Sequence, residues 1–180
     1  TVVPKLIPFH NLTAVLKKLL QEQLPITDMR KILEILSELA GRNLNVSDTA
    51  EALRPALIPL LLQRVVPLKD AIPVITLEPS FENVLINTDR QNQQEDLIID
   101  ANLSQIMMRK LSDVVDAQIA ENKTPFLIVS PVIRRKLSQL VRSHLRDLHI
   151  LSFTELPETK KVDVIATISG TDDVEEDAGA

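Results

Sequence analysis

Apolar residues in the first third of the chain recur every three or four positions, which is the spacing of one face of a helix. Pro25 ends the first of these runs, and Gly41 follows the second as a stop signal. Pro55 and Pro59 fall inside the third run, so we expect that helix to be kinked or restarted there. The pattern predicts a small all-helical subdomain over residues 1–64.

The pattern changes at residues 65–73, which carry two prolines and which we interpret as a linker. A short apolar strand over 74–77 and a short helix over 80–86 come next. The polar run NTDRQNQQED that follows is typical of an exposed loop. Asp100 then has the side chain and the position of a helix cap, because it precedes a long stretch with helical spacing.

The last third of the chain predicts strands on both sides of one helix. FLIVS, residues 126–130, is short and β-branched and follows a proline, which favours a buried strand. Helical spacing over 132–147 leads to a second strand, HILSF, at 149–153. A strand, a helix and a strand favour a parallel crossover. The seven residues ELPETKK are then a natural place for the chain to reverse into VDVIATI, residues 162–168, whose apolar residues alternate.

These elements predict an α+β fold. The all-helical subdomain is followed by a small α/β subdomain over residues 74–169, with a short mixed sheet and packed helices. Aromatic residues make up only 2% of the chain, so the core must consist of Leu, Ile and Val. Residues 170–180 are rich in Asp and Glu and lack periodic apolar residues, and we expect them to form a disordered acidic tail.

The charge of the chain argues against a general nucleic-acid or membrane surface. The net charge is −5, and five acidic residues lie between Asp172 and Asp177. The remaining body is close to neutral and gives no basic footprint. The chain has no cysteine, which excludes disulfides and thiolate chemistry.

The residues needed for common catalytic sites are missing. With three glycines in the chain, neither a glycine-rich phosphate loop nor a GxSxG nucleophile turn can be built. Ser130 stands between a predicted strand and helix, and we interpret it as a helix cap. The three histidines, His10, His144 and His149, do not have metal-ligand spacing. We therefore predict no catalytic, cofactor-binding or metal-binding residues and no enzymatic activity.

Three arginines give the clearest interaction signal. Arg135, Arg142 and Arg146 share one stripe of the predicted helix over 132–147, opposite its apolar face. The stripe is either a solvated helix face or a surface that binds an acidic partner through guanidinium contacts. We predict partner binding by these three residues. An alternative is a nucleic-acid-binding regulatory domain that uses the Arg135–Arg146 basic helix, although the chain has no Trp or Tyr for base stacking.

Three segments in the same order along the chain resemble the FlhA/LcrD family of type III export-gate proteins, found in flagella and injectisomes. The first spans residues 3–39, the second is VITLEPSFE at 74–82, and the third spans 125–157. The matching positions are Val3-Pro4, Val15-Leu16, Leu19-Leu20, Glu22, Ile26, Asp28, Ile32-Leu33-Glu34, Val74–Glu82, Pro125, Leu127, Val129, Arg134, Leu137, Leu140, Ile150-Leu151-Ser152 and Glu155-Leu156-Pro157. Together they cover nearly the whole chain.

The resemblance implies a non-enzymatic role in protein export. The chain would be a fragment holding the last two cytoplasmic subdomains of a bacterial inner-membrane protein, which meets the membrane only through a missing N-terminal region. Its helical part would help to form a subunit ring in the full-length protein. Its last subdomain would dock export substrates, chaperones or soluble export components such as the ATPase complex. We expect no binding of nucleic acid. We favour the flagellar over the injectisome branch.

Overall fold

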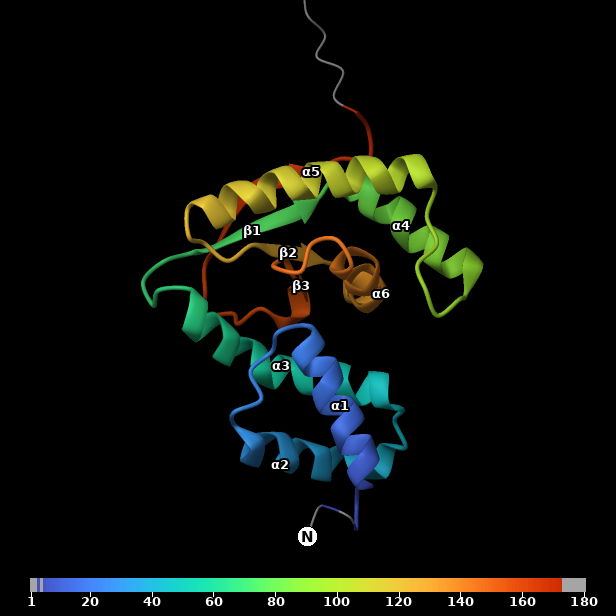
Figure 1. Cartoon of the computed structure of the whole chain (residues 1–180), viewed down its shortest axis with the longest axis vertical. Helices are drawn as coiled ribbons and strands as arrows, with labels where there is room; N and C mark the ends of the chain where they lie inside the picture. The colour runs from blue at the N-terminus through green and yellow to red at the C-terminus, as the bar shows by residue number, and fades with distance from the viewer. Residues whose placement is uncertain (1–2, 4, 173–180) are drawn as a thin grey trace, which may run out of the picture. The chain divides into compact units, whose positions relative to one another are not determined.

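The structure is a computed structural model that describes residue 3 and residues 5–172 (Figure 1). The acidic tail expected over 170–180 therefore lies outside the described residues beyond Asp172. The chain forms two compact units, which we treat separately. The first contains the chain up to Ile72 together with Phe153–Lys161, and the second contains Pro73–Ser152 together with the chain from Val162. Of the helices over these described positions, none combines the length and the apolar character needed to cross a membrane.

Over its described residues, the helical unit contains three α-helices and two 3₁₀ turns. They are α1 (Phe9–Gln21), α2 (Met29–Leu39), η1 (Ala40–Arg42), α3 (Val46–Val65) and η2 (Phe153–Glu155). Each α-helix buries one apolar face in a core built mainly from Leu and Ile, as the composition predicts. The longest helix, α3, contacts both α1 and α2.

The expectation that α3 restarts at its prolines is wrong. The helix runs without interruption through Pro55 and Pro59. A proline inside a helix lacks the N–H that would bond the carbonyl four residues earlier. Pro55 is exposed, while Leu53 and Leu57 beside it are fully buried. Burial of the apolar face therefore holds the helix together where its backbone hydrogen bonds are weakened.

The part of the α/β unit that the structure describes, up to Asp172, contains one four-stranded sheet and three helices. Its elements are β1 (Ile72–Leu77), α4 (Pro79–Asn92), α5 (Ala101–Ala120), β2 (Phe126–Val129), α6 (Pro131–Arg142), β3 (His149–Ser152) and β4 (Val162–Ile168). The strand order is β3-β2-β1-β4. Parallel pairing aligns Ile75 of β1 with Leu127 of β2, and Leu127 with Ile150 of β3.

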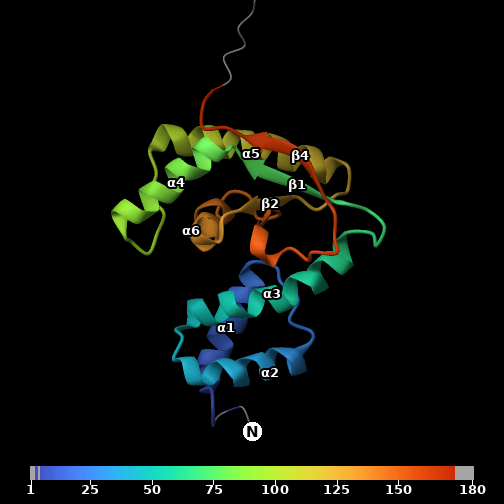
Figure 2. The same cartoon turned by 180° about the vertical axis from the view of Figure 1, so that it is seen from behind.

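The expected mixed sheet is wrong, because all four strands are parallel. Backbone hydrogen bonds run from Ile72 N to Lys161 O (2.8 Å) and from Glu78 N to Ile168 O (2.8 Å), so β1 and β4 advance in the same direction. A reversal after ELPETKK would have placed β4 beside β3. Instead, residues 153–161 cross from one edge of the sheet to the other, and β4 lies beside β1 (Figure 2). This crossing segment packs within the helical unit, although the sequence analysis placed it in the α/β subdomain.

Strand β4 also lacks the expected burial alternation. Its residues are exposed up to Ile165, and only Ile168 is buried. Between the two hydrogen bonds just given, β1 advances by six residues and β4 by seven. This difference is that of a β-bulge, in which one extra residue shifts the side chains that follow to the other face. The bulge therefore separates the exposed start of β4 from its buried end.

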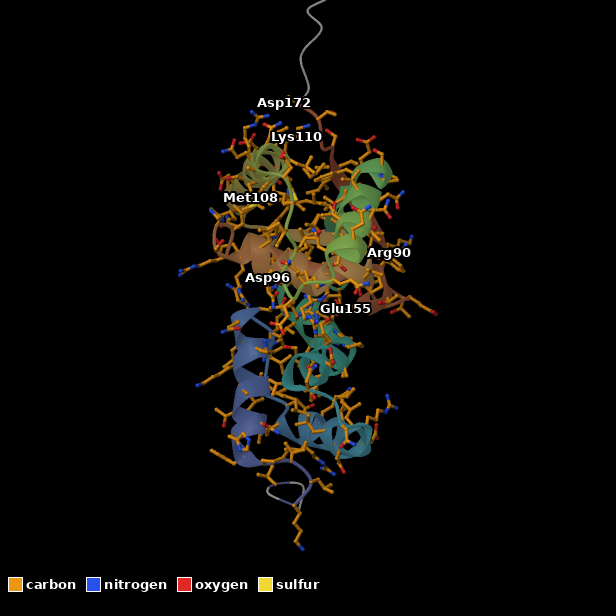
Figure 3. All side chains as sticks on the ribbon, turned by 90° about the vertical axis from the view of Figure 1, so that its right-hand side faces the viewer. Arg90, Asp96, Met108, Lys110, Glu155 and Asp172 are labelled. Atoms are coloured by element: carbon orange, nitrogen blue, oxygen red, sulfur yellow. The ribbon has the colours of Figure 1, made fainter. Side chains whose placement is uncertain are left out.

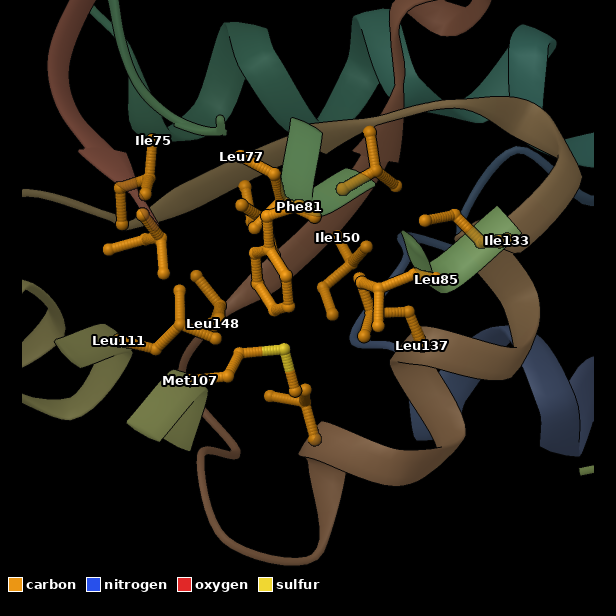
Figure 4. Close-up of a cluster of buried hydrophobic side chains, with 14 of the residues drawn as sticks. Ile75, Leu77, Phe81, Leu85, Met107, Leu111, Ile133, Leu137, Leu148 and Ile150 are labelled. Carbon is orange, nitrogen blue, oxygen red and sulfur yellow. The ribbon is translucent and has the colours of Figure 1, made fainter. Parts of the chain in front are cut away.

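One face of the sheet is covered by all three helices of this unit. Side chains from α4, α5 and α6 meet those of the strands in a single apolar cluster, in which Phe81 and Met107 lie near the centre (Figure 4). Asp100 caps α5 as expected, since its Oδ1 accepts hydrogen bonds from the N–H groups of Asn102 (2.9 Å) and Leu103 (3.1 Å).

Helix α4 is longer than expected, and it contains most of the polar run interpreted as a loop. It continues to Asn92 and ends at Gln93, which has a left-handed backbone with φ 45°. Only Phe81 and Leu85 of this helix are buried, so its polar residues form the exposed faces of an amphipathic helix. Beyond β4, the chain is fastened to α5, because Lys110 Nζ donates to Ser169 Oγ (2.6 Å) and Arg109 pairs with Asp172 (Figure 3).

Candidate protein-binding surface

The candidate surface is formed by α6 and the turn that follows it. Helix α6 begins where the sequence predicts, because Ser130 Oγ accepts a hydrogen bond from Val132 N (3.4 Å) and Pro131 occupies the first turn. Ile133, Leu137 and Val141 are buried in the apolar cluster. The opposite side of the helix is therefore the part that is available to solvent.

The predicted arginine stripe is partly wrong. Helix α6 ends at Arg142, and not at residue 147. Arg135 and Arg142 lie on this helix and are half-buried, whereas Arg146 is exposed in the turn before β3. Just after the helix end, Ser143 Oγ and His144 Nδ1 share a hydrogen bond of 2.7 Å. Local hydrogen bonds of side chains such as serine compete with the continuation of a helix. The structure thus places two of the three arginines on one helix and the third beyond its end.

A fourth arginine of the same helix has a structural role that the sequence analysis did not assign. Arg134 is only 1% exposed, and its Nη1 donates to the backbone carbonyl of Ile150 (3.2 Å). The guanidinium therefore joins α6 to the edge strand β3. Its position next to the apolar residue Ile133 and three residues before Leu137 was the available signal, since it places Arg134 at the margin of the buried face.

Helix α6 is also joined to α4. Lys136 Nζ forms an ion pair with Asp89 and donates to the carbonyl of Gln94 (2.7 Å). Both charged side chains are mostly buried. These contacts fix the rotation of α6 and thereby the direction in which Arg135 and Arg142 project.

Glu82 on α4 contacts the start of α6 through the backbone of Ser130. The Ser130 backbone N–H donates to its carboxylate, which favours the ionised form. Burial of the carboxyl group has the larger effect and raises the pKa of Glu82 above its usual value of 4.5. The carboxylate occupies the position at the N-terminus of α6 where an anion is favoured by the helix dipole.

The helical unit contains a buried ion cluster that the sequence analysis missed. Arg54 of α3 is 2% exposed, and its Nε donates to Glu155 Oε1 at 2.7 Å while its Nη2 donates to Glu155 Oε2 at 3.3 Å. Its Nη1 donates to Glu22 Oε2 at 2.5 Å. One guanidinium thus joins the end of α1, the middle of α3 and η2. Arg54 directly follows Leu53 and precedes Leu57 by three positions, so its place on the apolar face could have indicated a buried cation.

Two pockets in the helical unit offer apolar surface and no catalytic groups among the described residues that line them. The larger, of about 280 Å³, lies between the end of α3 and residues 157–160, and the other, of about 230 Å³, lies between α1, α2 and the start of α3. Of the described lining residues, Lys160 alone is charged, and its Nζ donates to the carbonyls of Pro67 (2.9 Å) and Leu68 (3.2 Å). This part of the structure therefore presents no carboxylate or imidazole to either pocket for acid–base chemistry.

Comparison with known proteins identifies the family to which the chain is related. The FHIPEP family matches residues 1–161. The chain belongs to the FHIPEP family. It is 32% identical over 167 residues to the flagellar biosynthesis protein FlhA of Buchnera aphidicola from Schizaphis graminum, which covers 92% of the chain and 24% of that protein. It is 31% identical to FlhA of Escherichia coli, over 93% of the chain and 24% of that protein.

A relative from a different secretion system is more distant. The secretion system apparatus protein SsaV of Salmonella typhimurium is 25% identical, over 90% of the chain and 23% of that protein. The FHIPEP chain therefore spans about a quarter of the length of the curated relatives that it matches.

Solved structures share the fold. The Chlamydia pneumoniae CdsV protein, in its complex with CdsO, matches 93% of the chain and 48% of that protein's chain with a TM-score of 0.80 and 25% identity. A nonameric structure of SctV-C from EPEC matches 93% of the chain and 50% of its own with a TM-score of 0.79 and 21% identity. The resemblance inferred from sequence to an export-gate family is confirmed.

Proposed function

We propose that this chain is part of the cytoplasmic portion of a type III protein-export gate in the bacterial inner membrane. It contributes to a ring of subunits and docks soluble export components. The observation that carries the proposal is the match over 93% of the chain to CdsV, whose structure was determined with CdsO bound. The nonameric state of SctV-C supports the ring.

The flagellar branch is favoured over the injectisome branch. The flagellar relatives named above are 31–32% identical to the chain, while SsaV is 25% identical. We propose flagellar export substrates and their chaperones as further partners of the full-length protein.

The proposed docking residues are Arg135, Arg142 and Arg146. Arg146 is exposed, and the other two are half-buried near it in the chain. Guanidinium groups at such a surface suit carboxylates on a partner. The alternative of a nucleic-acid-binding regulatory domain is disfavoured, because a continuous basic helix over Arg135–Arg146 is not present.

In this proposal the chain acts by binding other proteins, and its side chains make or break no covalent bond. The mostly buried carboxylates Glu155 and Asp89 are held by Arg54 and Lys136 respectively. These groups hold elements together within the two units, and none of them lines either of the two pockets described above. We infer that the chain acts by presenting shaped surfaces to other proteins.

A deletion tests the export role. Removing the codons of this segment from the gene that encodes it, in the source bacterium, is expected to abolish secretion of flagellar proteins and motility. An immunoblot must show that the shortened protein still accumulates. Supplying the complete gene restores both properties if the proposal is correct, and normal secretion in the deletion strain refutes it.

A binding measurement tests the docking role. We expect the purified chain to bind the source bacterium's counterpart of CdsO saturably in biolayer interferometry. An unrelated coiled-coil protein of similar charge serves as the control. Equal binding to both proteins, or to neither, contradicts the docking role.

A further inference from the structure

We propose that the start of β4 is a docking edge for an extended segment of another protein, which adds to the sheet as a fifth strand. This mode of recognition uses main-chain hydrogen bonds for affinity and side chains for selectivity. The proposal is independent of the export role, because it concerns binding by the chain itself.

Strand β4 is at the end of the strand order β3-β2-β1-β4 formed by residues 72–168 of the described chain. Its partner on one side is β1. The carbonyl of Lys161 points toward β1, since it accepts the N–H of Ile72 (2.8 Å). In the same peptide group the N–H of Val162 points in the opposite direction. The start of β4 thus directs a backbone donor away from the sheet.

The side chains at this edge are apolar and accessible. Val162 is 47% exposed, Val164 is 53% exposed and Ile165 is 38% exposed. The other edge strand, β3, is buried at all four of its positions. Exposed β-branched residues on an edge strand favour pairing with another strand, and sheets that avoid such pairing usually carry charges or proline there. Strand β4 contains one charged residue, Asp163, and no proline.

The charged residues on either side of Val162 indicate which charges a partner segment should carry. Lys161 and Asp163 are both exposed and are separated by two positions. Side chains two positions apart in a strand lie on one face. An added strand matches them when it has an acidic residue opposite Lys161 and a basic residue opposite Asp163, since opposite charges stabilise cross-strand pairs. The occupant is therefore an extended segment with an acidic and a basic residue two positions apart and valine or isoleucine beside them.

The bulge in β4 limits the length of the pairing. A bulge interrupts the regular pattern of backbone groups, and edge strands use bulges to prevent indiscriminate association. We therefore expect a short contact at the first residues of β4. A second copy of the chain carries the same two charges at this edge, so pairing between two copies is the alternative outcome that the experiment must distinguish.

Two synthetic peptides test the proposal. Both are valine-rich octapeptides with blocked ends and a fluorescent label, one with glutamate and lysine two positions apart and the other with lysine at both positions. Fluorescence anisotropy titration with the purified chain should show that the mixed-charge peptide binds about twofold to fivefold more tightly than the two-lysine peptide, which is the range of a cross-strand charge pair. The variant Lys161→Glu, which carries two acidic residues at this edge, should prefer the two-lysine peptide.

The variant Val162→Pro tests the backbone contact. Proline is tolerated at the first residue of a strand and removes only the N–H that points away from β1. We expect an unchanged circular dichroism spectrum and about twofold to tenfold weaker binding of the preferred peptide. Binding of neither peptide, an unchanged preference in Lys161→Glu or full binding by Val162→Pro would overturn the proposal. Sedimentation showing a dimer that the peptides do not dissociate would overturn it as well.

Discussion

Arg54 Nε and Glu155 Oε1 are 2.7 Å apart in the helical unit, although the two residues are separated by 101 positions in the sequence. Both side chains are almost completely buried. The pair holds the crossing segment 153–161 against α3, and the same guanidinium binds Glu22. In such a set each charge compensates the desolvation of the others, so the removal of one member leaves the remaining charges uncompensated.

Replacing Arg54 by Met should strongly destabilise the helical unit. The change leaves Glu155 and Glu22 without the cation that compensates their burial, and breaking a buried ion pair in this way costs about 3–5 kcal/mol. The free energy of unfolding, measured by urea denaturation, should fall by this amount.

The matched control is Arg30→Met on α2. Arg30 pairs with Glu34 four residues later, but both side chains are exposed. An exposed pair of this kind contributes about 0–1 kcal/mol. If the two substitutions lowered the free energy of unfolding equally, the Arg54 cluster would not be a stabilising feature.

Replacing Gly170 by Ala should destabilise the α/β unit. A Cβ atom at this position would lie 2.8 Å from Cδ2 of Phe81 and 3.1 Å from Cδ1 of Leu103. The Phe81 ring is part of the buried cluster, so overpacking should lower the free energy of unfolding by about 1–3 kcal/mol. Gly41→Ala is the control, because nothing lies within 4 Å of its added Cβ. Equal thermal stability of Gly170→Ala and the parent chain would contradict the packing.

The apolar pattern was sufficient for most elements, because it reports which side of an element is buried. It predicted the helices of the first third and the strand–helix–strand order around Ser130. It did not predict the direction of β4, because ELPETKK is compatible with a reversal or with a crossing. What decides between them is the pairing of β4 with β1, a long-range contact that leaves no local signal.

The candidate site was harder to predict than the fold. A helical stripe containing Arg146 required the helix to continue past Arg142, yet periodicity alone does not locate a helix end. The roles of Arg134 and Arg54 depend on acceptors that are distant in the sequence, namely the Ile150 carbonyl and Glu155. Sequence spacing indicates that such cations are buried, but only the folded chain identifies what compensates their charge.

Replacing Glu82 by Gln should change how stability depends on pH. Burial raises the pKa of Glu82 in the folded chain above its unfolded value of 4.5. The folded state then binds this proton more tightly, so the contribution of Glu82 to stability is present below pH 4.5 and is lost as pH rises through the folded pKa. The glutamine side chain introduced by Glu82→Gln does not titrate, although its oxygen can still accept the Ser130 N–H.

Urea denaturation of both chains from pH 4 to 8 measures this difference. The stability of Glu82→Gln relative to the parent chain should increase as pH rises above 4.5 and should then become constant. Glu38→Gln on α2 is a suitable control, because Glu38 is exposed. A relative stability that is independent of pH, or that decreases with pH, would show that the pKa of Glu82 is not raised.

Reversing the charge of Arg135, Arg142 and Arg146 together should weaken binding of the soluble export component. If these guanidinium groups contact carboxylates on the partner, the glutamates repel the same groups, and we expect a loss of affinity of at least about tenfold in biolayer interferometry. Arg135 and Arg142 are half-buried, so circular dichroism must first show that the triple variant is folded.

Single substitutions at two exposed arginines separate a local contact from a general effect of net charge: Arg146→Glu should weaken binding, whereas Arg90→Glu on α4 should leave it unchanged. If Arg146→Glu and Arg90→Glu changed the affinity equally, Arg146 would be a solvated residue with no specific contact to the partner.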